Sequence, residues 1–187
     1  MSAPSLNAIL VRHGRTLLNA EGRLRGLANP ELDELGIAQA HATARALKPL
    51  HLIRVLSSPL RRAEATAAII ASESGVQNDV DPAFNDRDYG PWTGHIKEEV
   101  VAEWGSVDAA PGVEDTAVVL ERAMGGLDAL VATGTTGTIA IVSHDAVIRP
   151  ILAAIQPGIH VEAENGSWAE IGWDGEAWKV LSVDNVA

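Results

Sequence analysis

The central sheet of this protein is predicted from the stretch LNAILVRHG, residues 6–14. Residues 6–11 form an apolar run that only Asn7 interrupts, which is typical of a buried strand in a parallel sheet. The run ends abruptly in Arg12, His13 and Gly14. An imidazole beside a permanent cation at the edge of a buried sheet is suited to attack on a phosphorus centre. His13 is therefore a candidate nucleophile.

Further strands and helices follow in alternation. Short apolar runs at residues 52–56 and 138–142 predict two more buried parallel strands. Apolar residues at helical spacing predict three amphipathic helices between them, and Asp115 or Thr116 could cap the third. Gly125 and Gly126 weaken the prediction for the middle of that helix. The buried positions are expected at residues 37, 40, 44 and 47, then 60, 63, 67 and 70, then 120, 124, 127 and 131.

The end of the chain predicts a β-hairpin, because residues 167–173 and 176–183 are β-rich and flank Asp174-Gly175. Residues 79–112 read as long loops around one short helix at 95–104. We therefore expect one domain over residues 1–187, of the α/β class. It is a three-layer α/β/α sandwich with a mostly parallel central sheet, helices on both faces and a C-terminal antiparallel hairpin. The apolar hairpin edge could pair with a second copy, so a homodimer is one open possibility.

Composition and charge exclude several classes of protein. The chain has no cysteine, which excludes disulfides and thiolate metal sites, and no apolar run long enough to span a membrane. Residues 1–5 lack the features of a secretion signal, so we expect a cytoplasmic protein. The net charge of −11 argues against binding to nucleic acid or anionic membranes. The first 62 residues are nevertheless basic, with nine Lys and Arg against four acids, which fits a cationic pocket for a small anionic substrate.

Each predicted strand ends in residues that can bind or attack a phosphoryl group. The second strand is followed by Arg61 and Arg62, and the third by His144 and Asp145. The carboxyl ends of parallel strands share one edge of a sheet, where α/β proteins bind ligands. Arginine offers a planar fork of donors that suits phosphoryl oxygens. We also expect the turn after His13 to open a short helix whose free amides favour an anion.

Five motifs in a fixed order resemble those of the histidine phosphatase superfamily, in the branch that contains cofactor-dependent phosphoglycerate mutases and their phosphatase relatives. The resemblance runs from residue 9 to about residue 185. The motifs are RHGRTLLN (12–19), GRLRG (22–26) with its continuation to residue 40, SSPLRRA (57–63), NDRDYG with WTG (85–94), and VSH (142–144).

The resemblance implies a role for each matching residue. His13 would attack phosphorus and become phosphohistidine, and Asp86 would protonate the leaving group and then activate the attacking water. The implied ligands of the phosphoryl oxygens are Arg12, Arg62, His144 and Asn19. The implied contacts to the rest of the substrate are Arg25, Gly26, Tyr89 and Lys97. Neither a metal nor a cofactor is expected.

The sequence also departs from the family pattern. Arg15 replaces a glutamate, and a surface position is its simpler interpretation. Asp86 stands where most mutases have glutamate, and Asp88 is a competing candidate for the acid. Asp145 replaces a common glycine and is expected to reject bulky or anionic substrate tails. The altered motif at residues 112–115 leaves the role of Glu114 open, and Trp92 and Trp104 could line the substrate entrance.

The combined expectation is a phosphomonoesterase that acts on a small phosphorylated metabolite whose identity the sequence does not name. The short stretch between residues 94 and 111 offers only Lys97 as a cation, which favours a phosphatase over a mutase. The alternative is phosphoryl transfer of the phosphoglycerate mutase type, which needs a second anion site. A catalytically silent phosphate-recognition module is a third hypothesis. The loss of His13, an arginine or the acid would favour it, and none of them is missing.

Overall fold

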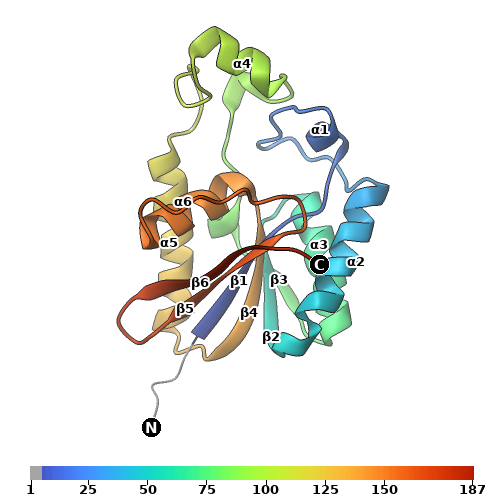
Figure 1. Ribbon diagram of the computed structural model, residues 1–187, viewed down its shortest axis with the longest axis vertical. Coiled ribbons are helices and arrows are strands. Elements are labelled where there is room, and N and C mark those ends of the chain that lie inside the picture. The colour runs from blue at the N-terminus through green and yellow to red at the C-terminus, as the bar shows by residue number, and fades with distance from the viewer. Residues whose placement is uncertain (1–5) are drawn as a thin grey trace.

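A six-stranded mixed sheet forms the centre of this computed structural model, which describes residues 6–187 (Figure 1). Its strand order is β3-β2-β4-β1-β5-β6. The first four strands run parallel, whereas β5 is antiparallel to β1 and β6 to β5. The strands are β1 (Leu6–Arg12), β2 (Leu52–Ser57), β3 (Asn78–Val80), β4 (Gly137–Ser143), β5 (Trp168–Trp173) and β6 (Trp178–Asn185).

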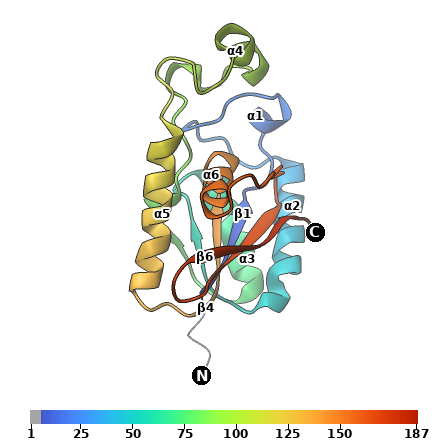
Figure 2. The ribbon, with the colours of Figure 1, turned by 60° about the vertical axis from the view of Figure 1, so that its left-hand side comes forward.

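The two central parallel strands, β1 and β4, are apolar on both faces because each face builds a separate core. In β1, Leu10 packs into one core and Val11 into the other, and both side chains are buried. Helices α5 (Thr116–Ala132) and α6 (Asp145–Ile155) cover the first face, and α2 (Glu34–Leu47) and α3 (Arg61–Ser74) cover the second (Figure 2). The predicted three-layer sandwich with a C-terminal hairpin is confirmed.

Two of the three predicted helix faces need correction. All four positions of the second predicted face, the N-cap of α3 and three residues within α3, are buried. On α2, however, Ile37 is 45% exposed, because Gly36 packs directly against the backbone of Arg15 and turns the helix. On α5, Val119 and Leu130 are buried together with Leu127, so the buried face lies about one residue away from the predicted one.

The long segment between α3 and α5 carries several short elements, and its part around α4 (Lys97–Trp104) rises above the sandwich (Figure 1). This helix was predicted, but it begins at Lys97 rather than at residue 95. Strand β3 was not predicted, since its three exposed residues leave no apolar pattern. The other short elements are α1 (Leu17–Ala20) and the 3₁₀ turns η1 (Lys48–Leu50), η2 (Pro82–Phe84) and η3 (Gly90–Trp92).

None of the helices in the described part of the chain has the length and apolarity needed to cross a membrane. The predicted lack of a secretion signal concerns residues 1–5, which lie outside the described residues.

The two adjacent glycines of α5 have opposite surroundings. A Cβ on Gly126 would lie 2.8 Å from the Cβ of Ala83 and 2.9 Å from Cζ of Phe84, whereas a Cβ on Gly125 would meet nothing within 4 Å. Gly126 therefore lets η2 dock closely on α5, directly before the loop that carries Asp86.

We expect Gly126→Ala to lower the free energy of unfolding by about 1–3 kcal/mol through overpacking. Its neighbour Gly125→Ala should raise the same quantity by up to about 1 kcal/mol, because alanine is the better helix former. Urea unfolding followed by circular dichroism measures both variants. A shift of the two variants in the same direction would contradict the close docking of η2.

Candidate active site

The carboxyl ends of β1, β2 and β4 bring the sequence motifs together. Arg12 at the end of β1 pairs in register with Ser143, and Ser57 at the end of β2 pairs with Val142. His13 and His144 follow β1 and β4 directly, and their ring centroids lie 5.1 Å apart. Arg62 reaches the same place from the first turn of α3. The structure therefore confirms the prediction that the carboxyl ends of these strands lie together.

Four of the five predicted catalytic side chains contact one another in a cluster closed to solvent. The Nε of Arg62 lies 3.2 Å from Nε2 of His13, and its Nη2 donates to Oδ2 of Asp86 at 2.8 Å. The Nδ1 of His144 lies 3.4 Å from the same carboxylate oxygen. None of the four side chains is more than 2% exposed. Arg12 borders the cluster and donates to the carbonyl of Ala163 at 2.7 Å.

The hydrogen bonds of His13 fix the position of its ring proton. Its Nδ1 lies 2.7 Å from the carbonyl oxygen of Gly14, which can only accept, so Nδ1 carries the hydrogen. Arg62 can only donate, so Nε2 accepts and carries none. The lone pair of Nε2 points into the cluster, as an attacking nitrogen requires.

Burial keeps both imidazoles neutral. It lowers the pKa of His13 well below its usual value, and the positive charges of Arg62 and Arg12 lower it further. Burial lowers the pKa of His144 in the same way, again with the help of Arg62. Hydroxyl Oγ of Ser58 lies 2.8 Å from Nε2 of His144 and holds the ring in place.

Burial has the opposite effect on the carboxyl group of Asp86. Desolvation raises the pKa of Asp86 to about 6, although the adjacent Arg62 charge opposes the shift. Asp88, the competing candidate, is only half-buried and uses Oδ1 to cap the amide of Gly90 at 2.7 Å. Within residues 6–187, the Asp88 side chain forms no hydrogen bond or ion pair with the cluster. The geometry therefore favours Asp86 as the acid.

Three buried nitrogen atoms at or beside the cluster have no hydrogen-bond partner among the described residues. They are Nε of Arg12, Nε of Arg25 and Nδ1 of His144. A buried donor without a partner costs about 1–3 kcal/mol. An anion that offers several acceptor oxygens could supply the missing partners.

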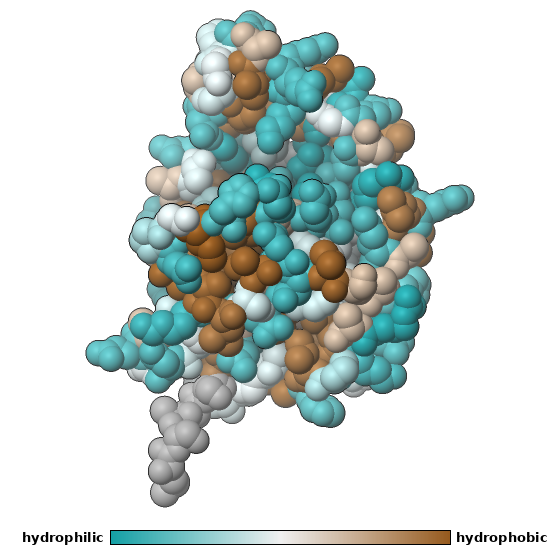
Figure 3. All heavy atoms as spheres, in the orientation of Figure 1, coloured by the Kyte–Doolittle hydropathy of each residue, from teal (hydrophilic) through white to brown (hydrophobic). Residues whose placement is uncertain are grey.

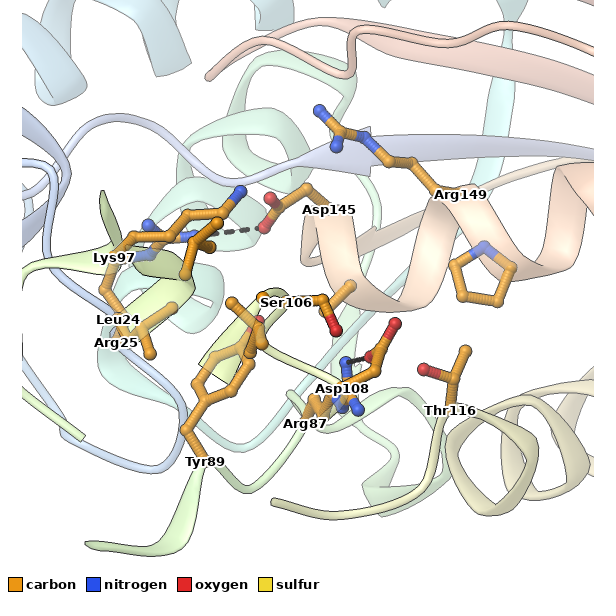
Figure 4. Close-up of a pocket in the computed structure, with 15 residues that line it drawn as sticks. Leu24, Arg25, Arg87, Tyr89, Lys97, Ser106, Asp108, Thr116, Asp145 and Arg149 are labelled. Atoms are coloured by element: carbon orange, nitrogen blue, oxygen red, sulfur yellow. Dashed lines mark hydrogen bonds and ion pairs between the residues drawn. The ribbon is translucent and has the colours of Figure 1, made fainter. Parts of the chain in front are cut away.

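A pocket of about 420 Å³ is lined by Lys97 of α4 and by Asp145, which directly follows His144 of the cluster (Figure 4). Three of the predicted substrate-binding residues, Arg25, Tyr89 and Lys97, line it. The fourth, Gly26, contributes its carbonyl oxygen, which accepts from Nη2 of Arg62 at 2.8 Å. A side chain at Gly26 would meet the ring of Tyr89 at 2.9 Å, and its φ of +47° also favours glycine.

One expectation around the pocket is wrong, and a second is met only in part. Trp92 and Trp104 do not line it; their rings pack against each other with centroids 5.8 Å apart. The turn after His13 does not offer free amides to an anion. The amide of Gly14 donates to Oγ1 of Thr66, and that of Arg15 to Oε1 of Gln39. The expected short helix is present as α1, but it begins only at Leu17.

Asn19 and Arg15 have structural partners. The side-chain oxygen of Asn19 accepts from the amide and the hydroxyl of Thr16, in a capping box at α1. Its role as a phosphoryl ligand stays a prediction. Arg15 pairs with Asp33 at 2.8 Å with 37% of its side chain exposed, which agrees with a surface position.

The residues that hold the acid loop were not predicted. Arg122 of α5 donates to the carbonyl oxygens of Asn85 at 2.7 Å and Asp86 at 2.9 Å. Glu114 pairs with Arg122 at 3.3 Å and accepts from the amide of Asp88 at 2.9 Å. Arg122 is the only basic residue in the sequence of α5, and this was the available signal. Glu114 thus gains a role as an anchor of the loop.

Comparisons with known proteins agree with this geometry. The family model described as histidine phosphatase superfamily (branch 1) matches residues 8–186. Phosphoserine phosphatase 1 of Hydrogenobacter thermophilus is 33% identical over 94% of this chain and 86% of its own. A 2,3-bisphosphoglycerate-dependent phosphoglycerate mutase of Methylobacterium sp. is 40% identical, but over only 52% of this chain and 49% of its own. The solved structure of a mycobacterial glucosyl-3-phosphoglycerate phosphatase with VO3 superposes with a TM-score of 0.85 at 26% identity, over 97% and 99% of the two chains.

We expect His13 to remain in the neutral Nδ1–H form from pH 5.5 to pH 8, because burial and the neighbouring arginines disfavour its charged form. Long-range ¹H–¹⁵N spectra of the histidine rings measure the tautomer and the titration directly. A protonation of His13 close to the value of free histidine, about 6.5, would contradict the closed cluster.

Proposed function

The chain belongs to the histidine phosphatase superfamily, branch 1, and is a phosphatase; we propose that it hydrolyses a small organic phosphate monoester in two steps through a phosphohistidine at His13. The observation that carries this proposal is the neutral His13, whose unprotonated Nε2 faces the Arg62 guanidinium that also holds Asp86. The named phosphatase matches most of the chain, while the mutase matches half of it, which supports hydrolysis over transfer to a second substrate.

In the first step, Nε2 of His13 attacks phosphorus while the ester P–O bond breaks. Arg12, Arg62 and His144 bind the three phosphoryl oxygens, and their donors balance the charge that spreads over them in the transition state. The phosphoryl oxygens compete with Nε2 of His13 for the Arg62 guanidinium, which frees the nitrogen lone pair. Asp86 gives its proton to the leaving oxygen, so the product leaves as an alcohol.

In the second step, Asp86 is a carboxylate and accepts a proton from a water molecule. The oxygen of that water attacks phosphorus, the N–P bond breaks, and inorganic phosphate leaves. Asp86 and His13 return to their starting protonation states. A cytoplasmic location and a homodimer are further parts of the proposal that rest on the sequence alone.

We expect His13→Ala to lower hydrolysis of any phosphomonoester by about 10³-fold or more, because the covalent route is lost. Wild-type protein quenched during turnover of a ³²P-labelled ester should retain label that is labile to acid and stable to alkali. The matched control is His41→Ala, since His41 is exposed on α2 and lies outside the cluster. Full activity in His13→Ala, or label that survives in it, would overturn the mechanism.

We expect Asp86→Asn to lower kcat/KM by about 10²–10⁴-fold for an alkyl phosphate, and far less for a nitrophenyl phosphate, whose leaving group needs no proton. The acid works only when protonated, so wild-type activity on the alkyl ester should fall as the pH rises through about 6. The pH profile of Asp86→Asn should lack this fall in activity, and should keep the change that the titration of the substrate phosphate causes.

The control for the acid is Asp88→Asn. We expect this variant to retain the wild-type ratio of activity on the alkyl ester to activity on the nitrophenyl ester, and the wild-type pH profile. If Asp88→Asn lost activity on the alkyl ester while Asp86→Asn kept it, the two carboxyl groups would have to exchange roles.

A further inference from the structure

Asp145 stands where the outer pocket meets the buried cluster. It is the first residue of α6 and follows His144 directly. Its Oδ1 lies 3.1 Å from Nη2 of Arg25 and 3.8 Å from Nη2 of Arg12. Its side chain is 17% exposed and lines the wall of the pocket (Figure 4). A negative charge therefore borders the place that the leaving alcohol would occupy.

The second oxygen of Asp145 is free to accept a hydrogen bond from a ligand. Within residues 6–187, the hydrogen bond and both ion pairs of this carboxylate use Oδ1, and none uses Oδ2. Burial raises the pKa of Asp145, but the charges of Arg12, Arg25 and Arg149 outweigh burial and hold the pKa below its usual range. The group is thus a carboxylate at neutral pH, which accepts hydrogen bonds and cannot donate them.

The cations of the pocket differ in their availability. Arg12 and Arg25 are buried, and both guanidinium groups face the Asp145 carboxylate, whose single charge offsets one of their two positive charges. Lys97 and Arg149 are exposed and form no ion pair within the described residues. A substrate carboxylate close to the ester would therefore have to compete with the Asp145 carboxylate for these two buried guanidinium groups. The surface around this part of the molecule is hydrophilic, whereas hydrophobic residues gather over α6 and the β5–β6 hairpin (Figure 3).

We propose that Asp145 determines substrate specificity, by selecting esters whose alcohol carries a hydrogen-bond donor, an ammonium or hydroxyl group, on the carbon next to the ester-bearing carbon. It rejects esters with a carboxylate at that place. The proposal rests on the phosphatase reaction proposed above and adds the class of substrate. It differs from steric exclusion, because the discrimination comes from charge and from the free Oδ2.

Four esters of similar size test the proposal: 2-aminoethyl, 2-hydroxyethyl, propyl and carboxymethyl phosphate. We expect the wild-type kcat/KM to be highest for the aminoethyl and hydroxyethyl esters, lower for the propyl ester and lowest for the carboxymethyl ester. A charge-assisted hydrogen bond contributes enough to separate the two ends of the series by about 10- to 100-fold. Comparison of the aminoethyl ester with the hydroxyethyl ester shows whether Asp145 favours a cationic donor over a neutral one.

The nearly isosteric Asp145→Asn variant should reduce the ratio of aminoethyl to carboxymethyl kcat/KM by about tenfold or more. The ratio is the readout, because release of Arg12 and Arg25 also changes the affinity for every phosphate. The matched control is Asp108→Asn: Asp108 lines the same pocket, but is 70% exposed and pairs with Arg87 at 2.6 Å. We expect the ratio in this control to stay within twofold of the wild type.

Thermal unfolding of Asp145→Asn shows whether the variant folds, since Asp145 also begins α6, and Asp145→Gly provides a second variant without the carboxylate. An unchanged ratio in a folded variant, or an equal change in Asp108→Asn, would overturn the proposal and leave the phosphatase function intact. Failure of the wild type to hydrolyse all four esters and nitrophenyl phosphate would instead contradict the proposed function.

Discussion

The buried guanidinium of Arg62 ties the active site together. Its nitrogen atoms reach Nε2 of His13, the carboxylate of Asp86 and the carbonyl oxygens of Gly26 and Ala28. A charged group removed from water is costly unless nearly every donor has a partner. The fold must therefore bring the end of β1, the segment after α1, the start of α3 and the acid loop to one point. Any shift of these segments would leave a buried charge unpaired.

Burial also sets the protonation states that the proposed chemistry needs. In water, an aspartic acid has lost its proton long before a histidine has lost its own, so a neutral imidazole and a neutral carboxyl group scarcely coexist. In this cluster, burial lowers the pKa of His13 and raises that of Asp86 to about 6. The pKa of Asp86 is thereby brought up to that of His13 or above it, against the usual order of the two groups. One physical cause prepares both an attacking nitrogen and a proton donor, and the arginines add to the effect on the histidine.

The sequence predicted those parts of the molecule that follow from local patterns. The buried strands, the hairpin and the residues at the strand ends each carry a local signal, and the parallel arrangement places the strand ends together. The positions that failed depend on contacts between distant segments. Ile37 is exposed because Gly36 meets the backbone of Arg15. The turn after His13 has no free amides because Thr66 and Gln39, far along the chain, accept from them. The anchors Arg122 and Glu114 act on a loop that the sequence does not place beside them.

The sheet order has a consequence for how the protein acquires its active site during folding. Strand β1 lies between β4 and β5, although more than a hundred residues separate it from either partner along the chain. Pairings between segments so far apart close large loops and form slowly. On the ribosome, His13 is made well before His144 and before the strands on both sides of β1. A growing chain therefore exposes its nucleophilic histidine without the groups that activate it, and catalytic competence arises only after β5 has been synthesised.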